Sequence, residues 1–343
     1  MDGSASVYPD WSHLPQLVVQ LISEKVKSII DYVRFRAVCQ PWRSASLSKP
    51  CHLPPQLPWL IKLQWYIYGK KDDGIRLFYD PWESKIHKIH LPETNDMNCY
   101  ASYRGWLLIA ATGGRSRKVF LINPLTRSRI DLPPFITPVK HLGGFCDNPC
   151  DVASYPYIYF STTCKMTFSM DLTDPDCLVM LFLSWQVILC CKVGDPCWTQ
   201  VDVCFNSLGN LIDVTYYNGR FYLLHKKAME IIESNKPKER TVYNFEPKIE
   251  AIYKYLLEGK SGVYIIACNF FKYDLYQFEE KPLKLKQIKD TSNTIFFLDR
   301  HLSLALCSDV WNSLDGGSRY MEDFCKPPAW GQAWTLWFQP SFL

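Results

Sequence analysis

The chain has 343 residues, of which 48% are hydrophobic and 21% are charged, and its formal net charge is +4. This length and composition predict a folded protein with a large core, organised as two domains or as one large repeat array. Because the charges are interspersed, no domain-wide positive field of the kind that drives nucleic-acid binding is evident.

Three features bear on where the protein works. The N-terminal stretch MDGSASVYPD lacks the basic start and apolar segment of a secretory signal. The longest apolar run, residues 178–191, is shorter than the roughly 20 residues of a membrane-spanning helix, so it favours two buried strands. The 14 cysteines occur without any Asn-x-Ser/Thr sequon, which favours reduced thiols. We therefore expect a protein of the cytoplasm, the nucleus or both, with no membrane contact.

The N-terminal segment has the apolar spacing of amphipathic helices. Ser12 is expected to cap a first helix, with Pro15 in its first turn. A second helix is expected over residues 28–40, and Pro41 should separate it from a short third helix that begins near Trp42. The first helix carries one apolar stripe, formed by Leu14, Leu17, Val18, Leu21 and Ile22.

The stretch RFRAVCQPWRS, residues 34–44, places three arginines around apolar residues. It is either a nucleic-acid-binding arm or a pair of helices whose charges cover a packed face. The arginines do not extend into a longer basic surface, which favours the packed helices. The residues expected on the packed face are Phe35, Val38, Cys39 and Trp42.

After the proline-rich segment 49–58, expected to be a linker, the sequence changes to short β-branched and aromatic runs. Asp80 and Asn123 each open a turn before a returning strand, and they are 43 residues apart; Gly219 and Gly262 show the same spacing. Such a period predicts the blades of a β-propeller. We expect a propeller over residues 59–343, with six blades favoured and five to seven possible.

Catalytic, cofactor and metal motifs find little support. EGKS at 258–261 lacks the earlier glycine of a phosphate loop, so it is interpreted as a hairpin turn. His141, Cys146 and Cys150 have no second ligand pair downstream, which favours core or loop positions. We expect no enzyme, no cofactor and no metal site, although distant residues of a propeller hydrolase or lectin could converge in three dimensions.

Four arginines flank the strand expected at residues 118–122. Arg115 and Arg117 precede it, and Arg127 and Arg129 follow it. Because the two loops lie at opposite ends of one strand, only one pair at a time can contact a ligand. Either pair could read a phosphorylated target, and exposed loop charge is the alternative interpretation.

The N-terminal segment resembles an F-box. The resemblance is carried by WSHLPQLVVQLI at 11–22 and VRFRAVCQPWRS at 33–44, which match the Leu-Pro opening, the aliphatic first helix and the Trp-Arg ending of that family. F-box proteins dock on a Skp-type adaptor of a cullin-RING ubiquitin ligase. The resemblance therefore implies an F-box over residues 10–48. It implies adaptor contacts by Leu14, Pro15, Leu17, Val18, Leu21 and Ile22, and a helical core of Val33, Phe35, Val38, Cys39 and Trp42.

The remainder resembles plant F-box proteins with a kelch-like propeller of the kinase-binding class. The residues that carry this resemblance are LINPLTRSRIDLPP at 121–134, GDPCWTQVD at 194–202, DVTYYNGRFYLL at 213–224 and FFLDRHLSLAL at 296–306. The resemblance implies a multidomain fold, α plus all-β, that acts as a non-catalytic substrate receptor for an unknown protein target. The alternative is a propeller scaffold that works without a ligase and retains a degenerate F-box.

Overall fold

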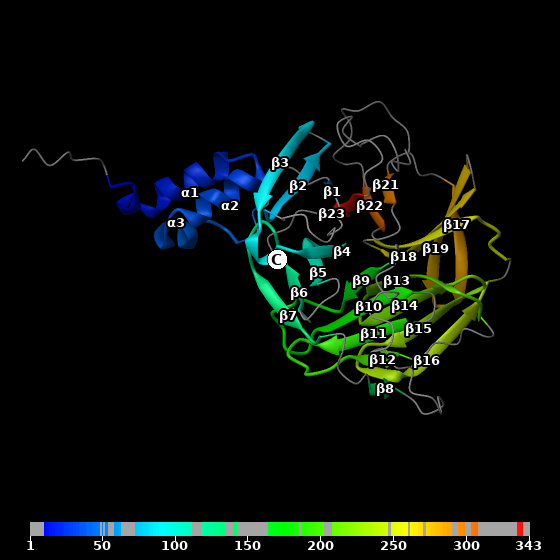
Figure 1. Cartoon of the computed structure of the whole chain (residues 1–343). Helices are drawn as coiled ribbons and strands as arrows, with labels where there is room; N and C mark the ends of the chain where they lie inside the picture. Colours follow the sequence, from blue (N-terminus) through cyan, green and yellow to red (C-terminus); the bar gives the residue numbers. More distant parts are fainter. Residues whose placement is uncertain are drawn as a thin grey trace, which may run out of the picture.

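The computed structural model describes residues 10–48, 50, 52–53, 58–62, 73–81, 83–111, 118–134, 140–142, 164–184, 187–201, 208–245, 248–259, 261–269, 272–289, 294–298, 303–307 and 335–338. These residues form a mostly β-sheet, propeller-like fold preceded by a few helices (Figure 1). Most of the expected linker 49–58 lies outside the described residues, as do Arg115, Arg117, Cys146 and Cys150. Across the described ranges, no helix is both long and apolar enough to cross a membrane.

The helices lie on one side of the sheets (Figure 1). They are the 3-10 turn η1 (Trp11–His13), α1 (Gln16–Lys25), α2 (Ile29–Ala37) and α3 (Gln40–Ala45). Ser28 caps α2, because its side chain accepts a hydrogen bond from the backbone N–H of Asp31. Pro41 stands in the first turn of α3, as predicted from its inability to continue the preceding helix.

The expected cap of the first helix is wrong. Ser12 belongs to η1, which is capped by Asp10, whose carboxylate accepts a hydrogen bond from the Ser12 backbone N–H at 3.0 Å. Three hydrogen bonds from Ser12 and His13, the Ser12 hydroxyl contributing most, lower the pKa of Asp10. The N-cap of α1 is Pro15, which has no side-chain cap hydrogen bond.

The expected core position of Val38 is also wrong, because this residue is 59% exposed. The buried residues of α2 are Ile29, Tyr32 and Phe35, each three positions after the last. Every such step falls about 60° short of a full helical turn, so the next residue in the series has rotated away from the direction of Ile29. In addition, α2 ends at Ala37, one residue before Val38.

The strands pair mainly with their neighbours in the chain, as in propeller blades (Figure 1). The first sheet has the order β23 (Thr335–Phe338), β1 (Trp59–Lys62), β2 (Ile75–Asp80), β3 (Lys85–His90). A 3-10 turn, η2 (Pro92–Thr94), leads to the second sheet, β4 (Met97–Tyr103), β5 (Trp106–Ala111), β6 (Val119–Ile122), β7 (Arg129–Leu132). The third has the order β8 (Lys140–Leu142), β12 (Thr199–Val201), β11 (Val187–Lys192), β10 (Leu178–Ser184), β9 (Lys165–Phe168).

Two further four-stranded sheets and one hairpin follow among the described residues. The fourth sheet is β13 (Leu211–Tyr217), β14 (Arg220–His225), β15 (Ala228–Glu233), β16 (Lys236–Asn244). The fifth is β17 (Tyr253–Gly259), β18 (Gly262–Asn269), β19 (Lys272–Glu280), β20 (Leu283–Ile288). The hairpin pairs β21 (Thr294–Leu298) with β22 (Ser303–Cys307).

Two pairings depart from the simple meander. In the first sheet, β23 pairs antiparallel with β1, with Trp59 opposite Phe338 and Lys62 opposite Thr335. The two ends of the β region therefore complete one sheet, which is how a propeller ring closes. In the third sheet, β8 adds to the outer edge and runs parallel to β12.

The repeat predicted from the sequence is confirmed. Asp80 ends β2 and Asn123 follows β6, and each of these strands is third in its sheet. Gly219 and Gly262 lie at equivalent hairpins between the first and second strands of the fourth and fifth sheets, and both have positive φ, +85° and +144°. Glycine tolerates this backbone conformation without the clash that a Cβ would cause.

The core lies between the sheets and reaches the helices. All seven residues of β4 are buried, which fits a strand covered on both faces. The buried side chain of Ile29 in α2 belongs to one cluster with Trp59, Ile61 and Phe78 of the first sheet. The helical segment is therefore anchored on the propeller through α2.

Candidate functional site

The apolar stripe expected on the first helix lies on the surface. In α1, Leu17 is 74% exposed, Leu21 is 60% exposed, and Val18 and Ile22 are each 39% exposed. Pro15 is exposed as well, and Leu14 is half-buried. The stripe therefore does not pack against the sheets.

The inward face of α1 is a different pair of residues. Val19 is 1% exposed and Ser23 is 2% exposed, and these positions are four residues apart on one side of the helix. The Ser23 hydroxyl donates a hydrogen bond to the carbonyl oxygen of Gln20 at 2.7 Å, which satisfies this buried polar group. The other four aliphatic side chains of the helix, Leu17, Val18, Leu21 and Ile22, remain on the solvent side.

The expected helical core is only partly buried. Phe35 is 8% exposed and its ring lies 4.6 Å from the ring of Trp42. Trp42, Val33 and Cys39 are half-buried. The indole N–H of Trp42 donates a hydrogen bond to the carbonyl oxygen of Trp11 at 3.0 Å, which holds η1 against α3.

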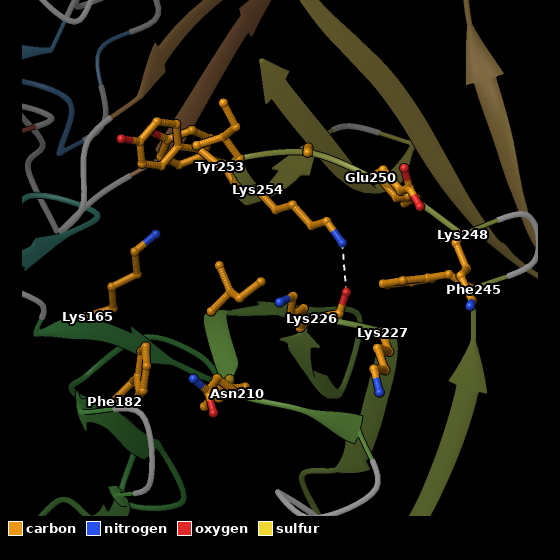
Figure 2. Close-up of a pocket in the computed structure, with 16 residues that line it drawn as sticks. Lys165, Phe182, Asn210, Lys226, Lys227, Phe245, Lys248, Glu250, Tyr253 and Lys254 are labelled. Atoms are coloured by element: carbon orange, nitrogen blue, oxygen red, sulfur yellow. Dashed lines mark hydrogen bonds between the residues drawn. The ribbon is translucent and has the colours of Figure 1, made fainter. Parts of the chain in front are cut away.

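A pocket with a volume of about 690 Å³ lies in the propeller (Figure 2). It is lined by the start of β13, by the turn between β14 and β15, and by the segment that leads from β16 to β17. In an antiparallel four-stranded sheet these three places lie at the same end of the strands, which explains why they meet. Phe245 and Ile249 supply buried apolar walls, and Ile252 and Tyr253 are about half exposed.

Lysines dominate the polar lining of this pocket. Lys226, Lys227 and Lys248 are exposed, and Lys254 is 6% exposed. The Lys254 Nζ donates a hydrogen bond to the carbonyl oxygen of Lys226 at 2.7 Å (Figure 2) and lies 5.6 Å from the centre of the Phe245 ring. Burial, and then the positive charge of Lys226, lower the pKa of Lys254.

Lys165, at the edge of the same pocket, has a structural role. Its Nζ lies 2.5 Å from Asp213 Oδ2, and both side chains are buried. Asp213 also accepts hydrogen bonds from the backbone N–H groups of Val214 and Leu256, each at 2.8 Å. One carboxylate thus ties β9, β13 and β17 together, strands of three successive sheets.

One histidine–glutamate pair and several thiols of the propeller are buried. His225 Nε2 lies 3.0 Å from Glu230 Oε2, but both side chains are 0% exposed and cannot contact a substrate. Burial raises the pKa of the Cys99 thiol and that of the Cys190 thiol to about 12, so both stay protonated at neutral pH. Cys190 and Cys191 face different core clusters, as expected for neighbours in a strand.

One group of possible metal ligands occurs in the first sheet. Asp80, Glu83 and His87 bring their ligand atoms within 4.8 Å of one another. His87 stacks on Trp59 with the ring centres 4.8 Å apart, and its Nε2 lies 3.9 Å from Asp80 Oδ2. The stacking accounts for the buried position of the imidazole ring.

The sheets and their closure define a β-propeller carried behind a short helical segment. A family model described as the KIB1-4 beta-propeller matches residues 78–332. The chain belongs to this family of propeller proteins.

Curated relatives carry the F-box name. The F-box protein SKIP23 of Arabidopsis thaliana is 24% identical over 90% of this chain and 83% of its own length. The F-box only protein 7 of the same plant is 32% identical over 62% of this chain and 55% of its own length. The putative F-box protein At2g33200, also from Arabidopsis thaliana, is 37% identical over 36% of this chain and 30% of its own length.

Solved structures resemble the chain only distantly. A quinonprotein alcohol dehydrogenase-like protein from Bacteroides thetaiotaomicron has a TM-score of 0.38 and 10% identity, over 76% of this chain and 64% of that chain. A likeness at this level supports no functional conclusion. The resemblance to plant F-box proteins with a kinase-binding-type propeller therefore stands on the family model and the curated relatives.

Sequence reasoning missed the propeller pocket and the inward pair of α1. The position of Lys254 beside the Lys226 carbonyl depends on a hairpin elsewhere in the chain. Val19 is adjacent to Val18 in the sequence and is the same residue type, and the two differ only in burial, with Val19 packed inside and Val18 partly exposed. No local signal in the sequence could have found either feature.

Proposed function

We propose that this chain is the substrate-recognition subunit of a Skp–cullin–F-box ubiquitin ligase. The helical segment, residues 10–48, acts as the F-box, and a six-bladed propeller over residues 59–343 holds the protein target. The observation that carries the proposal is the exposed stripe of α1, where Leu17 is 74% exposed and Leu21 is 60% exposed. Exposed aliphatic residues gathered on one short helix are typical of a surface that is buried in a complex.

The proposal assigns no catalytic residue to this chain. A substrate receptor accelerates ubiquitin transfer by raising the local concentration of the target near the transferring enzyme. Such a role needs two binding surfaces and a rigid body between them. The anchoring of Ile29 in the core of the first sheet supports a fixed connection between the two. We place this activity in the cytoplasm, the nucleus or both, without cofactor, membrane or nucleic acid.

The adaptor contact is tested by co-purification of the full chain with a co-expressed Skp-type adaptor. We expect the Leu17→Asp/Leu21→Asp double variant to lose the adaptor, because two carboxylates would be buried without partners at the interface. The Leu14→Asp/Pro15→Ala variant should weaken the same contact. The matched control is Val242→Asp, which places one carboxylate on β16, where the valine is 41% exposed. Equal adaptor retention by the wild type and the α1 variants would exclude this docking mode.

We assign target docking to the propeller pocket of Figure 2. Exposed Lys226, Lys227 and Lys248 beside the apolar walls suit an acidic segment that also inserts an apolar side chain. The test is cross-linking in cells under proteasome inhibition, comparing the wild type with Lys226→Glu/Lys227→Glu. A target that is captured by the wild type and lost from this variant supports the assignment. Unchanged capture of every target by the variant excludes it.

A ligase-independent scaffold is the second candidate. The packing of Ile29 into the first sheet favours it, since a degenerate F-box could persist as a structural part of the propeller. This alternative requires that the wild type bind no Skp-type adaptor and that the amides of α1 be protected from hydrogen exchange in the isolated chain. Adaptor binding by the wild type would exclude it.

A further inference from the structure

A second hollow lies where the helices meet the propeller. It has a volume of about 670 Å³ and is lined by α2, α3, β3 and the turn between β6 and β7. We call it the junction cleft. It shares no lining residue with the pocket of Figure 2, and the exposed stripe of α1 does not contribute to it. The adaptor surface and the target pocket therefore leave this cleft unassigned.

The charges that line the junction cleft are all positive. They come from both parts of the molecule and are Arg34, Arg36, Arg43, Lys88 and Arg127, joined by the titratable side chain of His90. No aspartate or glutamate lines the cleft among the described residues. Of the arginines, Arg34 has a nearby carboxylate, that of Asp31 at 3.3 Å, and both side chains of this pair are largely exposed. The cleft thus concentrates positive charge although the whole chain is close to neutral.

Three of the guanidinium groups are held in place by carbonyl oxygens. Arg36 donates to the carbonyl of Leu47 at 2.9 Å, and Arg43 donates to the carbonyl of Arg36 at 3.3 Å. Arg127 donates to the carbonyl of His90, which links the second sheet to the first. A carbonyl orients a guanidinium without cancelling its charge, and each guanidinium has five N–H donors. Most of these donors remain available to an anion.

The floor of the junction cleft is apolar. Ile30 and Val33 of α2 face Ile89 of β3 and Leu125 of the β6–β7 turn across the same hollow. Among the described residues, no phenylalanine, tyrosine or tryptophan lines it, so it offers no aromatic platform on which bases could stack. Positive charge over an aliphatic floor matches an anionic group flanked by apolar side chains.

We propose that the junction cleft binds a phosphorylated serine or threonine within a peptide segment of a partner protein. The phosphate would take bidentate hydrogen bonds from Arg127 and Arg36, and apolar residues beside it would occupy the aliphatic floor. The volume of about 670 Å³ exceeds what a single phosphate needs, which favours a peptide over the free ion. The peptide belongs to the target of the ligase, so this proposal rests on the proposed function.

Occupancy would also couple the two parts of the chain. Arg36 and Arg43 belong to the helical segment, and Lys88 and Arg127 belong to the first and second sheets. A phosphate held by both sets joins the helices to the propeller and resists their separation. The phosphorylated target would thus be bound at the junction between the helices and the propeller, which sets the distance between adaptor and substrate.

The test measures fluorescence anisotropy of a labelled peptide pool with one fixed phosphoserine and mixed apolar flanks, using the full chain. We expect the phosphorylated pool to bind at least about tenfold tighter than the same pool without phosphate. The Lys88→Gln/Arg127→Gln variant should lose about tenfold in affinity for the phosphorylated pool. Lys88 suits this variant because its side chain is exposed and lines the cleft.

A matched control removes one lysine and one arginine elsewhere. In Lys236→Gln/Arg129→Gln the lost charges pair with Glu239 and Asp131 and do not line the cleft. This variant should bind the phosphorylated pool as the wild type does. Equal affinity for both pools, or phosphate-dependent binding that survives Lys88→Gln/Arg127→Gln, would overturn the inference.

Two competitors distinguish the source of the anion. Unlabelled phosphopeptide should displace the labelled pool at far lower concentration than inorganic phosphate, because only the peptide covers the aliphatic floor. Displacement by inorganic phosphate at the same concentration, or stronger displacement by a single-stranded RNA oligonucleotide, would overturn the proposed peptide occupant.

Adaptor co-purification is run in parallel, so that the two proposals fail separately. Adaptor binding without selective phosphopeptide binding rejects the inference and leaves the receptor function in place. Selective phosphopeptide binding without an adaptor supports the cleft as a phosphopeptide site and rejects the ligase role.

Discussion

In α1, Leu17 is 74% exposed and Leu21 is 60% exposed, whereas in β5 Leu107 and Leu108 are each 0% exposed. The same residue type therefore has opposite surroundings in the two parts of the molecule. The strands bury apolar side chains on both faces because neighbouring sheets cover them. The helical segment is too short to do so, and it packs on the propeller through α2, with Ile29 buried and Ile30 partly buried against the first sheet. The apolar side chains of the strands are thus covered within the protein, whereas the stripe of α1 is open to solvent.

One ion pair from each part of the molecule shows a similar contrast. In the propeller, the Lys165–Asp213 ion pair is buried, with side chains 8% and 2% exposed. In the helices, the Arg34–Asp31 pair is open to solvent, with side chains 76% and 62% exposed. Solvent screens the second pair, whereas removal of one partner from the first leaves an uncompensated buried charge.

The largest effect should come from breaking the buried pair. Asp213→Ala leaves the Lys165 ammonium without its carboxylate and also leaves the Leu256 backbone N–H unpaired. We expect a loss of about 3–5 kcal/mol in the free energy of unfolding. Urea unfolding followed by circular dichroism measures it. The matched change in the helices, Asp31→Ala, should cost less than about 1 kcal/mol. Similar losses for both variants would contradict the division.

The next effect concerns the leucines themselves. Leu108→Ala opens a cavity in the propeller core and should cost about 2–5 kcal/mol in the free energy of unfolding. Leu17→Ala removes an exposed side chain and should change stability by less than about 0.5 kcal/mol. Urea midpoints of the two variants provide the comparison. A large loss for Leu17→Ala would mean that the stripe is already buried within this protein in solution.

A smaller effect tests how η1 is held. Trp42→Phe keeps an aromatic ring against Phe35 but removes the hydrogen bond from the indole N–H to the Trp11 carbonyl. We expect a loss of about 1 kcal/mol and faster hydrogen exchange at the Ser12 and His13 amides, which are hydrogen-bonded to Asp10. Unchanged exchange at these two amides would show that η1 is stable without α3.

The architecture was predictable where short-range pattern decides it. The 43-residue spacing of Asp80 and Asn123 predicted the repeat, because each blade is a local meander with its own turn signals. The adjacent Cys190 and Cys191 were expected on opposite faces and do enter different clusters. These conclusions need only the alternation of side chains along a strand.

Contacts between residues far apart in the chain could not be predicted from the sequence. The Lys165–Asp213 pair joins the third and fourth sheets, and no pattern in either segment signals the other. The junction cleft likewise needs Arg36 and Arg127 to meet across the boundary between helices and propeller. Sequence periodicity predicts which face of a helix is apolar, but it does not say whether a neighbour covers that face. This is why Val19 was overlooked and Val38 was misplaced.

The smallest expected effect is the pH dependence of stability that a buried amine of the propeller, that of Lys254, produces. Burial and the neighbouring Lys226 charge lower the pKa of Lys254 below its ordinary value of 10.5. The folded state therefore holds the charged amine less favourably than the unfolded state does. This cost is fully present below the folded pKa and disappears as the pH rises from the folded pKa to 10.5. The wild type should gain stability over this window, and Lys254→Met, which lacks the amine, should not.

The measurement is the difference in urea midpoint between the wild type and Lys254→Met at several pH values from neutrality to 10.5, the ordinary pKa of the amine. Because all other titrating groups are common to both proteins, their contributions cancel in the difference. We expect the wild type to gain on the variant with rising pH, in the direction set by a lowered lysine pKa. Parallel midpoints would mean that the Lys226 carbonyl, which accepts the Lys254 hydrogen bond at 2.7 Å, compensates the charged amine fully in the folded protein. The pocket of Figure 2 would then stabilise the charged Lys254 amine as well as water does, and burial at this position would not cost stability.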